Sequence, residues 1–449
     1  MINITDKKIS IIGAARSGIA AAELAIRKGA IPFLSDKADE DKLADNIPLI
    51  KKLNIDFEVG GHTEKALDAD LMVISPGVPT NTEIIKKAKS KNIEVISEIE
   101  FASQFCEGKI IAITGTNGKT TTTSLIGHLL STAGIKNFVA GNIGNAFSNI
   151  TDIIKPDEYA VLEVSSFQLD LIKSFKPFIA AILNITPDHL DRYDNDLIKY
   201  AKSKQRIYEN QTQDDFLIIN IDSKILVENL NPILSKVFRF STNQELNDGC
   251  FLSDDLIIFR ENSQNVFSCN IKDIFIKGEH NLQNVMCAVI AGKILQISDE
   301  KIKDALASFK GVEHRIEFIR TINGVSYYND SKATNVDSVI VALKSFSNPI
   351  LLILGGRDKG NDYSLIENLV KEKVKKIYAV GESAQKVYDF FNKIVDTQIC
   401  SDFQEIVNQT INDAKENDVV LLSPACASFD MFNNYEHRGK VFKEIVNKL

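Results

Sequence analysis

The chain has 449 residues, of which 44% are hydrophobic and 25% charged, and its formal net charge is −8 at pH 7. These values are ordinary for a soluble globular protein, and the negative balance argues against a general nucleic-acid binder, because neutralising phosphates needs a basic surface. The six cysteines form no CxxC pair, so neither a zinc site nor a disulfide framework is indicated.

At roughly 100–200 residues per domain, the length favours three domains. The first residues carry no basic segment followed by a cleavable apolar stretch, and no apolar run approaches the roughly 20 residues that cross a bilayer. We therefore expect a cytoplasmic protein that does not insert into a membrane, and we also expect it to be a monomer that binds no nucleic acid.

The first stretch predicts a β-turn-α-β unit of the nucleotide-binding kind, with a further strand that runs into a Pro-Gly turn. The predicted elements are a strand at 8–12, a glycine-punctuated turn at 13–18, a helix at 19–28, a strand at 31–36 and a strand at 71–78.

The turn GAARSG is an imperfect GxGxxG, because Ala15 stands at the middle glycine. Asp36 follows Gly18 by 18 positions, close to the spacing of an acid that binds ribose hydroxyls. By itself this motif is weak, and a NAD-dependent dehydrogenase domain is an alternative.

A second strand-loop-helix unit, with a strand at 110–114 and a helix at 120–133, carries the strongest local signal. In the loop GTNGKT, Gly115 and Gly118 allow close backbone approach to an anion, Lys119 adds positive charge, and Thr120 offers a hydroxyl to Mg²⁺. The spacing GxxGKT departs from the P-loop pattern GxxxxGK[ST], so a glycine turn before an ordinary helix is the alternative.

Two apolar strands, predicted at 159–166 and 179–186, end in polar residues. Glu163 is a candidate oxygen ligand for Mg²⁺, although it could also be a solvent-exposed acid. His189, between Asp188 and Asp191, is either part of a cation site or a structural histidine beside helix-capping acids.

Three further features are ambiguous from composition. Lys204 lies in the predicted helix at 200–210, where it would be dismissed as surface charge. Asn142, in GNIG, could occupy a simple turn. Asn281 and Asn284 fall three positions apart on one helix face, where they could contact an adenine edge or cap the helix.

A third unit begins near Gly311, and strand-loop junctions are predicted at 326–335, 350–360, 374–382 and 418–430. Strands alternating with helices throughout predict parallel sheets. We expect an α/β protein of three domains: a Rossmann-like domain at 1–108, a central P-loop-type ATPase domain with a parallel sheet at 109–311, and a Rossmann-like domain at 312–449.

Twelve strings occur in the order typical of the Mur ligases: GAARSG, SPGV, TGTNGKT, GNIG, EVSSFQLD, NITPDHLDRY, KQRIYEN, GEHN, EHR, NDSKATN, GGRDKG and SPACASFD. Essentially the whole chain thus resembles this family of ATP-dependent amide-bond ligases. The resemblance implies ligation of D-glutamate to UDP-N-acetylmuramoyl-L-alanine through an acyl-phosphate, with ATP and Mg²⁺, in peptidoglycan precursor synthesis.

The resemblance also implies roles for residues in this sequence. The catalytic set would be Lys119, Glu163, His189 and Lys204, the last carbamylated. The metal ligands would be Thr120, Glu163, His189 and Lys204. ATP would contact Gly115, Thr116, Asn117, Gly118, Lys119, Thr120, Thr121, Asn281, Asn284, Arg315 and Asp330. The UDP part would contact Ala15, Arg16, Asp36, Ser75 and Gly77, and Asn142 would face substrate and phosphate. The incoming amino acid would contact Thr334, Lys359, Ser428, Phe429 and Tyr435, and Lys332, in the same NDSKATN string as Asp330, would also bind substrate.

Arg16, Phe429 and Tyr435 differ from the residue types expected at those places, which puts the exact pocket contacts in doubt. Three alternatives stand: a sibling ligase that adds a diamino acid, a folylpolyglutamate synthase, and a nucleotide-binding regulator without catalysis. The absence of a DNPR string disfavours the first. GAARSG and SPGV disfavour the second, and the intact Lys119, Glu163, His189 and Lys204 set disfavours the third.

Overall fold

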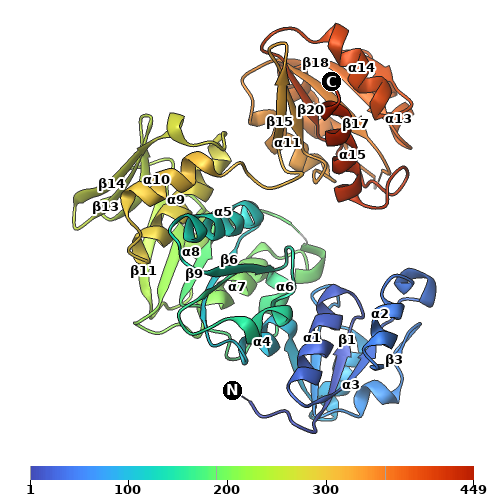
Figure 1. The fold of residues 1–449 in the computed structure, drawn as a ribbon, viewed down its shortest axis with the longest axis vertical. Coiled ribbons are helices and arrows are strands. Elements are labelled where there is room, and N and C mark those ends of the chain that lie inside the picture. Colours follow the sequence, from blue (N-terminus) through green and yellow to red (C-terminus); the bar gives the residue numbers. More distant parts are fainter. Residues whose placement is uncertain (1, 189, 359) are drawn as a thin grey trace. The chain divides into compact units, whose positions relative to one another are not determined.

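A computed structural model describes residues 2–188, 190–358 and 360–449. The chain divides into a first unit, Met1–Asp273 with Leu282–Ala307, and a second unit, Ile274–Asn281 with Ser308–Leu449. Two sheets lie in the first unit and one in the second (Figure 1). The predicted three-part α/β fold is confirmed, while the boundaries at 108 and 311 stay a prediction.

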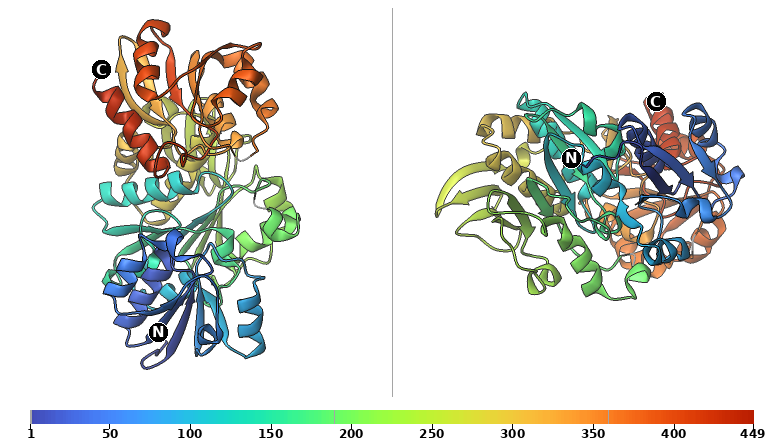
Figure 2. Two further views of the ribbon diagram at one scale, coloured as in Figure 1. Left: turned by 90° about the vertical axis from the view of Figure 1, so that its right-hand side faces the viewer. Right: turned by 90° about the horizontal axis from the view of Figure 1, so that it is seen from below.

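The first sheet has five parallel strands in the order β3-β2-β1-β4-β5. Its elements are β1 (Lys8–Ile12), α1 (Arg16–Arg27), β2 (Ile31–Ser35), α2 (Ile47–Lys52), β3 (Asp56–Glu58), β4 (Leu71–Ile74), α3 (Glu83–Ser90), β5 (Glu94–Ser97) and α4 (Glu98–Ser103). Ile9 and Ile11 pack with α1 and α4, whereas Ile12 and Met72 pack with α3. Helices therefore cover both faces (Figure 2), which is why the interior strand β4 is apolar and buried along its whole length, whereas the edge strand β3 is not.

The central sheet has nine strands in the order β14-β13-β12-β11-β10-β9-β6-β8-β7. Its strands are β6 (Lys109–Thr114), β7 (Asn137–Gly141), β8 (Tyr159–Glu163), β9 (Ile179–Ile182), β10 (Phe216–Asn220), β11 (Lys236–Ser241), β12 (Gly249–Ser253), β13 (Leu256–Glu261) and β14 (Gln264–Asn270). Its helices are α5 (Lys119–Thr132), α6 (Ser166–Leu169), α7 (Leu197–Gln205), α8 (Lys224–Glu228), α9 (Glu279–Ile294) and α10 (Asp299–Ser308).

The second unit carries a six-stranded sheet in the order β15-β16-β20-β17-β18-β19. Its elements are β15 (Glu317–Ile322), β16 (Val325–Asn329), α11 (Val336–Lys344), β17 (Ile350–Gly355), α12 (Glu367–Lys373), β18 (Val374–Val380), α13 (Ala384–Phe391), β19 (Asp396–Ile399), α14 (Phe403–Asp413), β20 (Val419–Leu422) and α15 (Tyr435–Asn447). Alternate residues of β17 enter two separate cores, Leu352 with α11 to α13 and Leu351 with α14 and α15.

The expectation of parallel strands throughout is wrong at two places. Strands β12, β13 and β14 pair antiparallel, as do β15 and β16. Tight turns cause this: Asn262-Ser263 and Asn323-Gly324 each have positive φ at both positions, the geometry of two-residue hairpin loops. The central sheet is therefore mixed rather than parallel.

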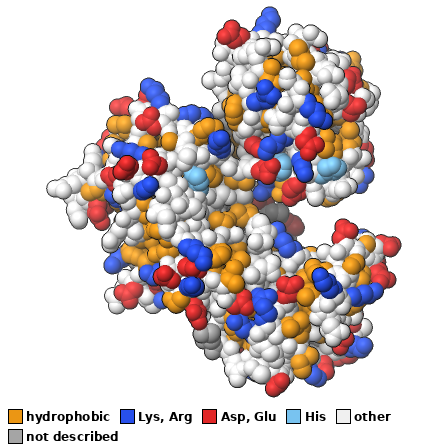
Figure 3. Space-filling model, viewed as in Figure 1, with side chains coloured by type: hydrophobic (Ala, Val, Ile, Leu, Met, Phe, Trp, Pro, Cys, Tyr) orange, Lys and Arg blue, Asp and Glu red, His pale blue; other side chains and the backbone are white. Residues whose placement is uncertain are grey.

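The two sheets of the first unit share one continuous apolar core, in which Phe101 of α4 and Phe105, just beyond the end of this helix, lie in the same cluster as Phe147. The buried carboxylate of Glu100 accepts hydrogen bonds from the backbone N–H groups of residues 173–175, which belong to the central part. These contacts fix the first sheet against the central sheet. Within the described residues, no helix is long and apolar enough to cross a membrane. On the face drawn in Figure 3, acidic and basic side chains are interspersed.

Candidate active site

The phosphate loop joins β6 to α5, as predicted. Gly115 and Gly118 have φ of 152° and 86°, a region that side-chain-bearing residues rarely adopt, so both glycines are required by the backbone. A Cβ on Gly118 would also collide with the side chain of Asn284. Lys119 Nζ donates to the carbonyls of Gly115 (2.9 Å) and Thr116 (2.8 Å), which holds its positive charge over the loop.

Asn184, which follows β9, braces this loop and was missed from the sequence. Its Oδ1 accepts from the N–H of Asn117 (2.8 Å), and its Nδ2 donates to the carbonyl of Asn117 (3.1 Å). The hydroxyl of Thr116 donates to Thr186 O at 3.1 Å, and Thr186 N–H donates back to it at 3.0 Å. The shape of the loop is thus set by a neighbouring strand end that the motif itself does not include.

Glu163, the last residue of β8, is buried with 3% of its surface exposed, so the solvent-exposed alternative is wrong. Its two oxygens accept from Thr120 Oγ1 (2.7 Å) and Asn142 Nδ2 (2.8 Å). The structure therefore brings together three of the predicted residues from three different strand ends. Of the residues described, none forms an ion pair with Glu163, and the Lys204 ammonium acts on this buried carboxylate only at longer range.

Lys204, on α7, is 1% exposed, so the surface position that the composition of this segment suggests is wrong. Its Nζ donates to Gly115 O at 2.9 Å and lies 4.4 Å from the ring centre of Tyr200. Burial, followed by repulsion from the Lys119 ammonium, lowers the pKa of Lys204 well below its usual value. Two lysines thus converge on one carbonyl of the phosphate loop.

A cavity of about 300 Å³ lies beside Lys119 and Lys204. Its wall includes Lys119, Asn142 and Lys204, together with Gly77 from the first sheet. The other lining residues are Pro76, Ser165, Ser166, Phe167, Asp188, Arg192 and Tyr200. Most of these escaped the sequence analysis, because they become neighbours only when β4, β8 and α7 come together.

The predicted UDP-binding residues surround the turn after β1. Asp36 accepts from the N–H of Ala14 at 2.6 Å, and Ser75 Oγ donates to Gly13 O at 3.1 Å. Ala15 and Arg16 are exposed at the start of α1. A Cβ on Gly18 would overlap the Gly13 carbonyl, so the second retained glycine serves close helix-turn packing.

The two asparagines of α9 behave differently. Asn284 is 2% exposed, and its Oδ1 accepts from Thr122 Oγ1 on α5 at 3.0 Å. Asn281 donates its amide to Lys277 O at 2.8 Å, a contact at the helix start. The hydrogen bond of Asn281 is consistent with a contact that stabilises the start of α9. The hydrogen bond of Asn284 joins α9 to α5, the helix that follows the phosphate loop.

In the second unit, Asp330 is 4% exposed and accepts from Ser423 Oγ (2.7 Å) and Ile316 N–H (3.2 Å). Burial raises the pKa of its carboxyl to about 7, and the nearby Arg315 opposes this shift only in part. A carboxyl that titrates near neutral pH is suited to proton transfer.

Of the described residues expected in this pocket, Lys332 and Thr334 lie on the loop after β16, Ser428 and Phe429 lie on the loop after β20, and Tyr435 begins α15. Lys332 Nζ lies 5.9 Å from the ring centre of Tyr435, and Ser331 Oγ donates to Tyr435 O at 2.8 Å. Thr334 is half-buried, Ser428 is 2% exposed and Phe429 is 60% exposed. Arg438, missed from the sequence, joins both loops by donating to Ser331 and to Cys426 O.

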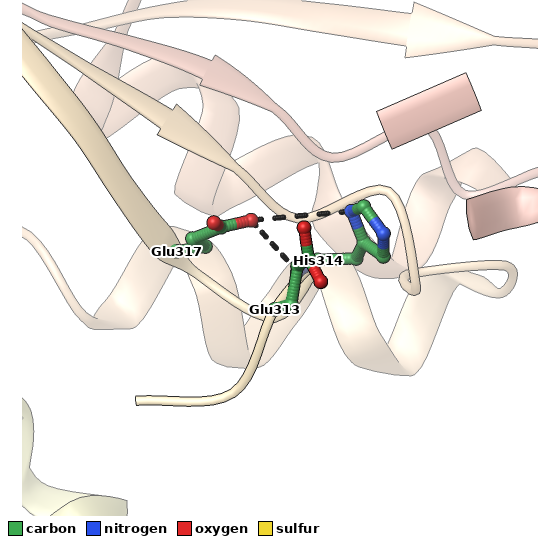
Figure 4. A group of neighbouring side chains, drawn as sticks. All are labelled: Glu313, His314 and Glu317. Carbon is green, nitrogen blue, oxygen red and sulfur yellow. Dashed lines mark hydrogen bonds and ion pairs between the residues drawn. The ribbon is translucent and has the colours of Figure 1, made fainter. Parts of the chain in front are cut away.

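Glu313, His314 and Glu317 place possible metal-ligand atoms within 4.8 Å of one another (Figure 4). Lys443 already neutralises this group, since its Nζ donates to Glu313 Oε1 at 3.0 Å and to Glu317 Oε1. Glu317 Oε2 also accepts from the N–H of His314 at 2.9 Å and from Asn329 Nδ2 at 3.0 Å. The cluster is therefore a satisfied structural brace.

Comparison with known proteins covers nearly the whole chain. Three family models match: the Mur ligase MurD-like N-terminal domain at residues 7–97, the Mur ligase middle domain at 113–292, and the Mur ligase glutamate ligase domain at 314–426. The chain is 45% identical over 449 residues to the UDP-N-acetylmuramoylalanine–D-glutamate ligase of Koribacter versatilis, covering 100% of this chain and 99% of the relative.

The chain belongs to the Mur ligase family.

A second Mur ligase relative, the UDP-N-acetylmuramoylalanine–D-glutamate ligase of Christiangramia forsetii, is 45% identical and covers 99% of this chain and 100% of its own. Among solved structures, the UDP-N-acetylmuramate–alanine ligase MurC of Thermotoga maritima matches with a TM-score of 0.62 at 18% identity, covering 98% of this chain and 99% of that one. The MurF ligase of Thermotoga maritima in complex with ADP matches with a TM-score of 0.58 at 15% identity, covering 99% and 96%. These likenesses show the shared Mur ligase fold.

Two residues expected in the Mur ligase site, His189 and Lys359, lie outside the described residues. Their roles, and the roles carried over to the other site residues, stay predictions.

Proposed function

We propose that the chain ligates D-glutamate to UDP-N-acetylmuramoyl-L-alanine, with conversion of ATP to ADP and phosphate, in cytoplasmic peptidoglycan precursor synthesis. The full-length identity of 45% to relatives named for this reaction carries the proposal. The site supports it, because Lys119 and Lys204, which both bind the phosphate loop, line one cavity with Asn142, which binds the buried carboxylate of Glu163.

The reaction has two steps. The terminal carboxylate of the acceptor attacks the γ-phosphorus of ATP, and ADP leaves. The neutral amine of D-glutamate then attacks the acyl-phosphate carbon, and the tetrahedral intermediate collapses to the amide and inorganic phosphate. The N–H groups at the start of α5 and the Lys119 ammonium would stabilise the phosphoryl group during both steps.

The second step needs a base, because the attacking amine must be neutral. Asp330, with a pKa of about 7, has the titration range that a base needs at neutral pH. His189 is the other candidate.

The residues around Glu163 fit Mg²⁺. A buried carboxylate that accepts from one hydroxyl and one amide, and that forms no ion pair in the described part of the chain, suits a hard divalent cation. Thr120 and Glu163 would hold one ion, and Lys204 with His189 a second. Bound Mg²⁺ supplies charge neutralisation for the transferred phosphoryl group.

Lys204 would contribute as a carbamate. A neutral amine is the form that reacts with carbon dioxide, and the lowered pKa of Lys204 favours that form at neutral pH. Carbamylation replaces a buried positive charge beside Lys119 with a carboxylate-like oxygen ligand.

The deciding test is phosphate release from ATP with UDP-N-acetylmuramoyl-L-alanine and Mg²⁺, with D-glutamate, L-glutamate, L-lysine or meso-diaminopimelate supplied separately. We expect release with D-glutamate alone. Release with a diamino acid would move the chain to a sibling reaction, and folded protein that binds ATP without release would be a non-catalytic binder. Light scattering on the same sample checks the expected monomer.

A further inference from the structure

Arg192 is a half-buried cation in the wall of the cavity, on the short helical turn Leu190–Tyr193. One of its terminal N–H groups donates to Val78 O at 3.1 Å, and its guanidinium carbon lies 3.8 Å from the ring centre of Phe167. Considering only described residues, no carboxylate is within ion-pair distance of it. A guanidinium has five N–H donors, so most of its donor capacity is open to a ligand.

Two contacts from different parts of the first unit fix the direction of this guanidinium. Phe167 belongs to α6, whose start is held by a capping box between Ser165 and Gln168. Val78 belongs to the loop after β4, directly beyond Gly77, which itself lines the cavity. Stacking sets the plane of the guanidinium, and the carbonyl sets its rotation, so the fork is preorganised between the two sheets.

The charges of the cavity wall favour an anion. Lys119, Lys204 and Arg192 supply three cations, and Asp188 is the one carboxylate among the lining residues. Lys119 is bound to the phosphate loop, where a nucleotide phosphate would lie. Arg192 bonds instead to the loop after β4 in the first sheet, so its expected ligand is the acceptor rather than the nucleotide.

We propose that Arg192 binds an oxyanion of the acceptor, through forked N–H donation, and thereby selects an acceptor that carries its negative charge at this place. This inference rests on the proposed function. The oxyanion could come from the diphosphate or from the terminal carboxylate of the acceptor, and both match the geometry of a guanidinium fork.

The test is isothermal titration calorimetry of full-length wild type, Arg192→Ala and Arg192→Lys with UDP-N-acetylmuramoyl-L-alanine, UDP-N-acetylglucosamine and ADP. Arg192→Ala is expected to weaken binding of the first ligand by roughly 10- to 100-fold and to leave ADP within about twofold, because a charge-assisted hydrogen-bonded pair is lost. Arg192→Lys keeps the charge without the fork and should fall between. Lys199→Ala is the matched control, since it removes the same charge where Lys199 pairs with Asp194 in solvent.

The second ligand separates the two sources, because UDP-N-acetylglucosamine has the diphosphate and lacks the carboxylate. An equal loss for both uridine ligands assigns the diphosphate, and a loss for the first alone assigns the carboxylate. Unchanged acceptor binding by Arg192→Ala, or an equal loss for ADP, overturns the inference and leaves the proposed function intact. Wild type that binds ADP and neither uridine ligand overturns both.

Discussion

Lys204 in the first unit and Arg438 in the second are both buried cations, with 1% and 2% of their surfaces exposed. Neither has a carboxylate within ion-pair distance among the residues that the structure describes. Arg438 compensates with three hydrogen bonds, to Ser331 Oγ (2.9 Å), Ser331 O (2.8 Å) and Cys426 O (3.0 Å). Within the described part of the chain, Lys204 has one, to Gly115 O.

The protonation of the two side chains follows from this difference. Burial lowers the pKa of Arg438 to about 10, so it stays charged at neutral pH and can brace two loops permanently. Burial and repulsion from Lys119 lower the pKa of Lys204 well below its usual value, which shifts this side chain toward the neutral, reactive amine. A buried cation with few hydrogen bonds therefore indicates a reactive role, whereas a buried cation with many hydrogen bonds indicates a structural role.

The largest effect is expected for Lys204→Ala, which should lower phosphate release by roughly 10²- to 10³-fold while the protein stays folded. The fold should persist, because the Gly115 carbonyl keeps its hydrogen bond from Lys119, and the same circular dichroism spectrum as wild type checks this. If a carbamate is the active form, a short carboxylic acid should partly restore the rate. Lys202→Ala, an exposed neighbour on α7, is the control. A fully active Lys204→Ala would remove this lysine from the mechanism.

Arg438→Ala should destabilise the second unit by about 3 kcal/mol, because it leaves two carbonyls and one hydroxyl without their donor. Thermal unfolding followed by circular dichroism should show a midpoint lower by roughly 10 °C. Exposed Lys440, on the same helix, gives the control variant. An Arg438→Ala protein that keeps its stability and responds to carboxylic acids as Lys204→Ala does would contradict the conclusion that Arg438 is structural and Lys204 is reactive.

Asp330 tests the same contrast with a buried acid. Its folded pKa of about 7 is above the ordinary 3.8, so the folded state keeps this proton to higher pH than the unfolded state does. The associated stability is fully present below about pH 4 and is lost as the pH rises through 7, by roughly 4 kcal/mol. Asp330→Asn should lack this loss in urea unfolding measured from pH 4 to 8. Parallel pH curves for the two proteins would contradict the raised pKa.

The phosphate loop could be predicted because Gly115, Gly118 and Lys119 lie close together in the chain, and the glycines within the motif set the backbone conformation of the loop. Glu163 could be placed at a strand end for the same reason. Lys204 could not be predicted as buried, since a lysine-rich helical segment has the composition of a surface and only the packing of α7 decides otherwise.

Other residues were missed because their contacts join distant segments. Asn184 and Arg438 act through hydrogen bonds to loops 67 and 107 positions away in the sequence, which no local pattern reports. The hairpin between β15 and β16 is different, because Asn323-Gly324 is a local signal for a two-residue turn that the sequence did contain.

The smallest effect is expected at the brace formed by Glu313, Glu317 and Lys443. Lys443→Met should destabilise the second unit by about 1 kcal/mol, because the partly exposed ammonium that joins two carboxylates is lost. If Lys443 is the cation of this cluster, millimolar Mg²⁺ or Mn²⁺ should not change the difference in midpoint between Lys443→Met and wild type. A divalent ion that selectively restores the stability of Lys443→Met would contradict this expectation. It would mean that the carboxylates of Glu313 and Glu317 can bind a metal ion in place of the Lys443 ammonium.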